Sequence, residues 1–176
     1  MKNKTIVGTI LIIFLFSSTI IAQEEKQKVE APQLTLEQKW QRAEYNLTST
    51  FIAGIAYAKS LGKSSSHFGK YLGEMFATGW EGPLSVTDFI KTMHWNWQMW
   101  SDFQIEGLEE SEDFYKAKIK GAGEKYVTSW TDPGVTLEEY YDCLGQVMTQ
   151  IAGSLGLEYK QKVEGDWVVF TVTEKK

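Results

Sequence analysis

The chain has few thiol and imidazole side chains, which could act together as a nucleophile and a general base. Its only cysteine is Cys143, and its only histidines are His67 and His94. A cysteine nucleophile needs a neighbouring base or a helix N-terminus that lowers its pKa. Cys143 falls in the second turn of an expected helix, so catalysis by Cys143 requires His94 or His67 to reach it through the fold. A lone cysteine is otherwise a small buried apolar side chain.

Residues 94–100, HWNWQMW, form the most unusual local feature of the sequence. On a helix, Trp97 and Trp100 share one face with Met93, and His94 lies a little around from them. This face either packs on a sheet with His94 at its border, or lines an apolar pocket in which His94 or a nearby amide orients a ligand. For the second interpretation, the candidate ligand-binding residues are Trp97, Trp100, Trp130, Tyr141 and His94.

No strong catalytic or metal-binding motif occurs in the chain. G-x-S-x-G, H-E-x-x-H, C-x-x-C and the acidic calcium loop are all absent. A metal site needs three or four convergent ligands, and the spacing of the two histidines and the cysteine does not provide them. We therefore expect neither a metal nor a cofactor.

Three helices are expected in the first half of the domain, because apolar residues recur there every three to four positions. They cover residues 36–61, about 66–79, and a third segment from about 85 to 100. Thr35 is suited to cap the first helix. Gly62 and the pair Gly82-Pro83 separate the three segments.

The apolar period then changes from 3.6 to 2, which indicates strands. Residues 102–108 and 113–120 form an expected hairpin around an acidic turn at 109–112, and residues 126–130 are a possible short strand. A fourth helix over 137–155 begins at a capping box, Thr136 to Glu139. A second hairpin pairs 157–163 with 167–173. The sequence thus predicts an α+β fold, with three helices, a hairpin, a helix and a C-terminal hairpin forming an antiparallel sheet packed on helices.

The N-terminus resembles an export signal. Residues 1–22 show a basic start, an apolar run and a small-residue exit ending at Ala22, which is the pattern of a secretory signal peptide. An uncleaved membrane anchor is the alternative, since no charge occurs from residue 5 to 23. We expect a polar linker at 23–35 and a single domain at 36–176, in the periplasm or outside the cell.

Composition excludes several classes of partner. Removal of residues 1–22 leaves 16 Lys and Arg against 23 Asp and Glu, a net charge of −7. Nucleic acids and anionic membranes both select basic surfaces, so we expect no nucleic-acid partner and no membrane contact after signal cleavage. One cysteine also excludes an intramolecular disulfide.

The C-terminal part resembles two protein groups. Residues 139–145, EYYDCLG, a helix ending at Gly156, and the hairpin at 163–170, VEGDWVVF, are similar to the L-2-amino-thiazoline-4-carboxylic acid hydrolase-like family and to the 4-vinyl reductase small-molecule-binding domain. The resemblance implies a fold with a ligand pocket. Cysteines are frequent near the turn in these groups, whereas Trp167 stands there in this chain, so the resemblance favours binding over catalysis.

Three functions remain open on this basis. The first is an exported domain that binds a small apolar or aromatic molecule without converting it. The alternative is a hydrolase of a small cyclic amide or thiazoline, with Cys143 as nucleophile and His94 or His67 as base. The second alternative is a structural or interaction protein of the envelope, which would have a solid core without a cavity.

Overall fold

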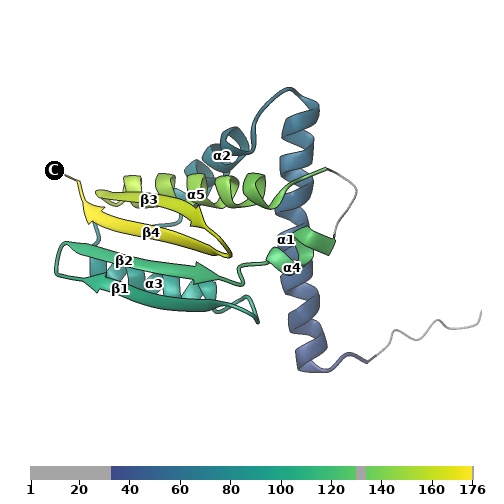
Figure 1. Cartoon of the computed structure of the whole chain (residues 1–176), viewed down its shortest axis with the longest axis horizontal. Helices are drawn as coiled ribbons and strands as arrows, with labels where there is room; N and C mark the ends of the chain where they lie inside the picture. The colour runs from purple at the N-terminus through teal and green to yellow at the C-terminus, as the bar shows by residue number, and fades with distance from the viewer. Residues whose placement is uncertain (1–32, 130–133, 176) are drawn as a thin grey trace, which may run out of the picture. The chain divides into compact units, whose positions relative to one another are not determined.

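The computed structural model describes residues 33–129 and 134–175 and confirms the α+β class. Residues Leu34–Lys176 form one compact unit. The expected signal peptide at 1–22, most of the linker, and Trp130 lie outside the described residues. Figure 1 shows the elements in chain order: α1 (Leu36–Ser60), α2 (Ser65–Ala77), α3 (Val86–Trp97), β1 (Gln104–Glu110), β2 (Phe114–Lys120), α4 (Glu124–Ser129), α5 (Leu137–Ser154), β3 (Leu157–Glu164) and β4 (Trp167–Glu174).

Hydroxyl side chains fix where the long helices begin. Thr35 and Gln38 form a reciprocal capping box on α1, and Thr136 and Glu139 form another on α5. Each box satisfies two backbone N–H groups that have no partner inside the helix. The helix starts were therefore readable from the sequence, and both capping boxes lie at the residues where the pattern predicted caps.

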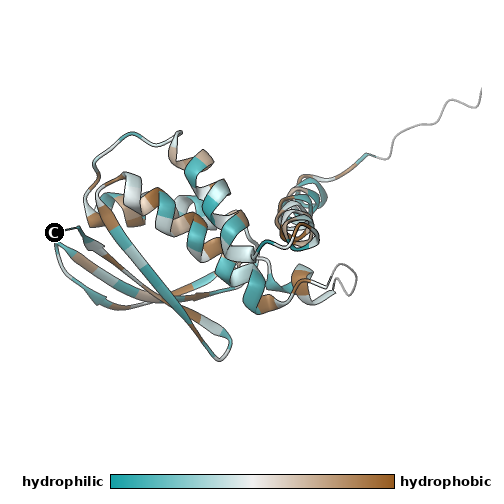
Figure 2. Cartoon of the chain, turned by 90° about the horizontal axis from the view of Figure 1, so that it is seen from above, coloured by the Kyte–Doolittle hydropathy of each residue, from teal (hydrophilic) through white to brown (hydrophobic). Residues whose placement is uncertain are grey.

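The two hairpins join in one antiparallel sheet with the strand order β1-β2-β4-β3. The central pair aligns Ile119 with Val168 and Ala117 with Phe170. Along β2, buried residues alternate with half-buried lysines, as the period of 2 predicts. Helices α3 and α5 lie on the same side of the sheet in Figure 2, so its apolar face forms the core with them.

Residues 124–129 form helix α4, so the prediction of a strand at 126–130 was wrong for the described part of that segment. Gly123 adopts a φ of 94°, and its carbonyl accepts the Tyr126 N–H at 3.0 Å, which starts a helical turn. The Tyr126 ring packs edge-on against Tyr45 of α1, with centroids 5.4 Å apart. These contacts with α1 are tertiary, and a reading of local alternation does not contain them.

The acidic turn of the first hairpin is shorter than the predicted turn at 109–112. Glu109 pairs with Lys116 and Glu110 with Tyr115, so both glutamates belong to β1. The chain reverses at 111–113, where the Ser111 N–H donates to the Phe114 carbonyl at 2.8 Å. A β-bulge between Gly107 and Glu109 supplies the extra residue. Pairing of glutamates with the lysine-bearing strand extends β1 beyond the predicted end.

Helix α2 packs on α5 through glycines. A Cβ atom on Gly69 would run into the carbonyl oxygen of Cys143 and lie 2.8 Å from the Cys143 Cα. A Cβ atom on Gly73 would lie 2.9 Å from the Val147 Cα. The absence of side chains at these two positions, one helical turn apart, lets the two backbones approach closely. This contact fixes the outer side of α5, whose other side faces the sheet.

Candidate functional site: an apolar cavity between helices and sheet

A cavity of about 370 Å³ lies between the helices and the apolar face of the sheet. Every element of the described chain except β1 contributes to it or to its rim. Its size falls in the lower part of the range for small-molecule sites. Most lining side chains are aliphatic, aromatic or methionine: Leu47, Phe51, Phe76, Trp80, Met93, Trp97, Met99, Trp100, Ile119, Ala122, Tyr141, Leu144, Val147, Met148, Ile151, Tyr159 and Val168.

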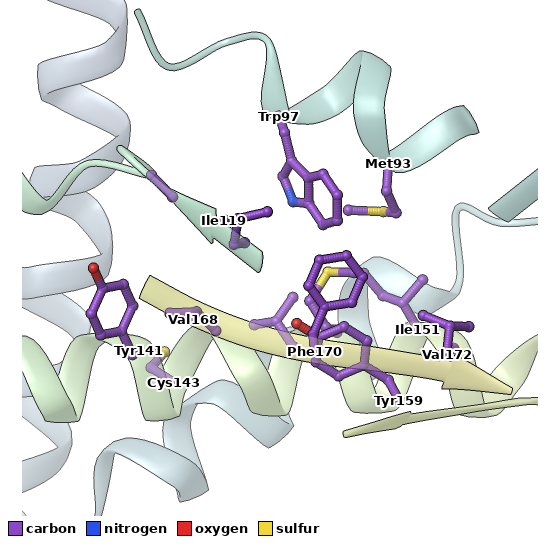
Figure 3. Close-up of a cluster of buried hydrophobic side chains, with 14 of the residues drawn as sticks. Met93, Trp97, Ile119, Tyr141, Cys143, Ile151, Tyr159, Val168, Phe170 and Val172 are labelled. Carbon is purple, nitrogen blue, oxygen red and sulfur yellow. The ribbon is translucent and has the colours of Figure 1, made fainter. Parts of the chain in front are cut away.

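The aromatic face predicted from the sequence lies in this cavity. Trp97 and Trp100 line it from α3 and the turn after α3, and Tyr141 lines it from α5. Figure 3 shows Trp97 directed toward the sheet; its ring centroid is 5.5 Å from that of Phe170. The Trp100 indole N–H lies 3.4 Å from the Thr48 hydroxyl oxygen. The face thus packs on the sheet and also lines the cavity.

A short polar chain marks one end of the cavity. The Tyr141 hydroxyl donates to Glu124 Oε1 at 2.6 Å, and the Gly121 N–H donates to the same oxygen at 2.8 Å. Gln161 donates to the Tyr141 carbonyl at 2.9 Å and accepts the Tyr159 hydroxyl at 2.8 Å. Burial and the bond to Glu124 raise the pKa of Tyr141 above the usual tyrosine range, so its hydroxyl remains a donor at neutral pH.

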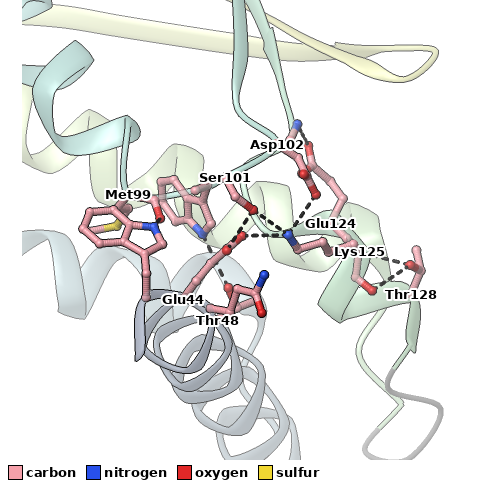
Figure 4. A network of polar contacts seen from close by, with 12 residues as sticks. Glu44, Thr48, Met99, Ser101, Asp102, Glu124, Lys125 and Thr128 are labelled. Carbon is pink, nitrogen blue, oxygen red and sulfur yellow. Dashed lines mark hydrogen bonds and ion pairs between the residues drawn. The ribbon is translucent and has the colours of Figure 1, made fainter. Parts of the chain in front are cut away.

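An ion-pair network around the buried Glu44 holds the segment beside the cavity. Glu44 of α1 is only 3% exposed, and its Oε1 lies 3.1 Å from the Lys125 ammonium. Lys125 also pairs with Asp102 at 2.9 Å and donates to the Ser101 hydroxyl at 2.8 Å. Figure 4 shows these bonds converging on Lys125. Because Ser101 directly follows Trp100, the network anchors the aromatic segment to α1 and α4.

The structure places His94 away from the cavity. It lines a separate cleft of about 190 Å³ together with Lys91, Glu110 and Tyr115. Its Nε2 is buried and has no hydrogen-bond partner within the described part of the chain. Burial lowers the pKa of His94, so the neutral form is favoured at pH 7. His94 therefore does not belong with Trp97 and Trp100 as a lining residue, and His67 is exposed at the start of α2.

Cys143 is fully buried on α5 and is not a lining residue of the cavity. Burial raises the pKa of its thiol to about 12, and the charge of Asp142 acts in the same direction. A nucleophilic cysteine needs the opposite shift. No hydrogen bond links Cys143 to either histidine in the residues that the structure describes. The geometry therefore supports the small buried apolar side chain that is usual for a lone cysteine.

Cys143 is expected to resist alkylation in the native protein. Iodoacetamide reacts with an accessible thiolate, and Cys143 offers neither access nor charge at pH 8. Intact mass should show no adduct after an hour under native conditions and one adduct in guanidinium chloride. As a control, Ser111→Cys in a Cys143→Ala background places a thiol on the exposed hairpin turn and should react within minutes. Rapid native alkylation of Cys143 itself would restore the nucleophile hypothesis.

Two polar lining residues, Glu124 and Gln161, were not predicted from the sequence. Gln161 lies two residues after Tyr159 on β3. The period of 2 therefore places its side chain on the same face as that buried tyrosine. Glu124 gave no such signal, because it precedes the segment 126–130 that was predicted as a strand, and no element was predicted at its position. Asn96 also lines the cavity, and its side-chain amide donates to the Thr92 carbonyl at 3.2 Å.

The described residues offer neither a metal site nor a membrane-spanning helix. No three His, Cys, Asp or Glu side chains there gather as a metal site requires. None of the helices in residues 33–129 and 134–175 combines the length and apolar character needed to cross a bilayer.

Comparisons with known proteins identify no relative. No family model matches the chain, and no curated protein and no solved structure is significantly similar to it. The resemblance to the two small-molecule families stays a prediction. The function is therefore argued from the geometry alone.

Proposed function

We propose that this protein is a non-catalytic domain that binds a small apolar or aromatic molecule in the cavity between α3, α5 and the sheet. The observation that carries the proposal is the cavity of about 370 Å³ lined by Trp97, Trp100 and Tyr141. Protein interiors are otherwise packed at the density of organic crystals, with few voids larger than a water molecule. An unfilled apolar volume of this size costs stability, and a ligand that fills it would recover that loss.

The composition of the wall indicates the class of ligand. Apart from Asn96, Glu124 and Gln161, the described lining residues are aliphatic, aromatic or methionine. A dry apolar cavity of ~150 Å³ already accepts benzene, so the larger volume here suits a molecule of about two fused rings. Methionines at 93, 99 and 148 adapt to the shape of the occupant because their side chains are unbranched and flexible.

The cavity also bears on the two other functions considered. An envelope structural or interaction protein requires only a solid core, which the observed cavity does not favour. The hydrolase considered above requires Cys143 and a histidine to face the substrate, and the described lining residues include neither Cys143 nor a histidine. Binding without conversion is therefore the function that the geometry supports best.

Filling the cavity is expected to abolish ligand binding without unfolding the protein. Leu144 lines the cavity and is only partly buried, so Leu144→Trp places an indole in the empty volume. Wild-type protein with 1-ethylnaphthalene at 100 times Kd should gain about 2.7 kcal/mol of stability, measured as a rise in Tm. Leu144→Trp should show no rise, and calorimetry should detect no binding at the same concentration of the probe.

The matched control is Leu108→Trp on β1, at a leucine that is 46% exposed and does not line the cavity. This variant should bind 1-ethylnaphthalene like the wild type. Equal loss of binding in both variants, or undiminished binding by Leu144→Trp, would contradict the assignment of the cavity as the binding site.

We place this binding activity outside the cytoplasm. The support is the basic, apolar and small-residue order of residues 1–22, with Ala22 as the expected last residue removed. The intact mass of protein recovered from the periplasm or medium should correspond to a chain that starts at Gln23. A full-length product that fractionates with membranes would show instead that the segment is a retained anchor.

A further inference from the structure

The polar end of the cavity holds Glu124, which is the one charged side chain among the described lining residues. Glu124 accepts two hydrogen bonds, from Tyr141 and Gly121, and both go to Oε1. Its Oε2 is buried from solvent and has no partner among the described residues. Nearly all buried polar atoms in proteins are hydrogen-bonded, and a charged acceptor is the most costly to leave unpaired. The missing donor is therefore a property of the site that needs an explanation.

Neighbouring cations are engaged elsewhere. The Lys125 ammonium pairs with Glu44 at 3.1 Å and with Asp102 at 2.9 Å. The Lys120 ammonium lies 4.5 Å from the centre of the Trp167 ring. Neither lysine donates to Glu124 in the structure.

The charges around Glu124 favour a cation. A second cleft, of about 330 Å³, adjoins the cavity. Glu124 and Tyr141 line both the cavity and this cleft. The charged residues of this cleft are Asp102, Lys120, Glu124, Lys125 and Asp166. Acidic groups outnumber basic ones there, so the local field attracts a positive group and repels an anion.

We propose that the ligand of the cavity is an amphipathic amine, whose ammonium pairs with the Glu124 carboxylate while its apolar body contacts Trp97 and Trp100. The proposal rests on the binding function proposed above. A charge-assisted hydrogen bond is shorter and stronger than a neutral one, so an ammonium pairs with this carboxylate better than a hydroxyl does. The two indoles supply the large flat contact area that an aromatic or aliphatic body requires.

Three probes of nearly equal size test the proposal by isothermal titration calorimetry at pH 7. They are 1-naphthylmethylamine, its neutral isostere 1-ethylnaphthalene, and the anion 1-naphthoate. We expect the wild-type protein to bind the amine at least about tenfold more tightly than the neutral isostere, and the anion most weakly. Equal affinity for the amine and the neutral isostere would overturn the proposed amine but leave the binding function intact. Failure of all three probes to bind would overturn both.

Two variants assign the preference to one carboxylate. Glu124→Gln keeps an acceptor for Tyr141 and Gly121 but removes the charge, so amine affinity should fall about tenfold while 1-ethylnaphthalene affinity changes less than about threefold. Asp166→Asn removes a charge from the neighbouring cleft only and should leave amine affinity within about threefold. A preference for the amine that survives Glu124→Gln would overturn the assignment. Should Glu124→Gln not fold, the order of the three probes on the wild-type protein still decides the proposal.

Discussion

Replacing Gly69 with alanine is expected to lower the free energy of unfolding by about 2 kcal/mol. The new methyl group would meet the Cys143 carbonyl and Cα of α5, and backbone atoms do not move aside as the end of a side chain does. Overpacking a core contact costs ~1–3 kcal/mol, and the better helix propensity of alanine offsets up to ~1 kcal/mol of that cost. For a chain of 176 residues, the Tm should fall by roughly 4–8 °C.

Gly153→Ala is the matched control for this prediction. Gly153 also lies in a helix, but a Cβ there would meet only the Lys175 ammonium at 3.3 Å. That flexible lysine end is free to shift, so Gly153→Ala should be neutral or raise the Tm slightly. A Gly69→Ala variant as stable as the wild type in thermal and urea unfolding would mean that α2 does not approach α5 as closely as the structure indicates.

Replacing Lys125 with methionine is expected to destabilise the protein by roughly 3 kcal/mol. This is the low end of the cost of breaking a buried ion pair, because the Lys125 side chain is 39% exposed while that of Glu44 is 1% exposed. The variant leaves the Glu44 carboxylate buried without its cation. Urea unfolding at pH 7 measures the loss, and the midpoint should shift without a change in the m-value.

The pKa of Lys125 sets the pH range of this contribution. Burial by itself would lower the pKa of the ammonium, but hydrogen bonds to Asp102 and Glu44 outweigh it and raise the pKa above the ordinary lysine value. A group whose pKa is raised on folding contributes its full stabilisation at every pH below its pKa in the unfolded chain, ~10.4 for lysine. This stabilisation is lost only as the pH rises through the pKa of the folded state. The pairing is therefore fully present at pH 7.

An exposed ion pair between a lysine and a glutamate provides the control. Lys160 lies 2.8 Å from Glu158 on β3, with the two side chains 70% and 47% exposed. Lys160→Met removes the same charge and should cost less than about 1 kcal/mol, since solvent screens such pairs. If both lysine variants lost equal stability, the network around Glu44 would have no special role in holding the aromatic segment beside the cavity.

The order and type of most elements could be predicted from the sequence because their signals are local. The capping boxes at Thr35 and Thr136 set helix starts, since a hydroxyl that accepts a backbone N–H three residues on needs no distant partner. The change from period 3.6 to period 2 marked both hairpins. The shared face of Trp97 and Trp100 likewise follows from helix geometry alone.

Features that depend on distant parts of the chain were decided only by the tertiary structure. The pairing of β2 with β4 joins two hairpins that α4 and α5 separate in the sequence. Helix α4 depends on packing against α1, which overrode the local alternation that predicted a strand.

The cavity is the clearest case of this second kind. Its volume is the space left over after side chains from α1, α2, α3, α4, α5 and three strands have packed. The sequence of any one of these segments does not show how much space the others leave. The same holds for the positions of two residues relative to it. Helix α3 turns His94 toward a separate cleft, and the turn before α4 brings Glu124 to the polar end of the cavity. The sequence by itself determined the aromatic wall, and the tertiary packing decided that the wall faces an empty space with a carboxylate at one end.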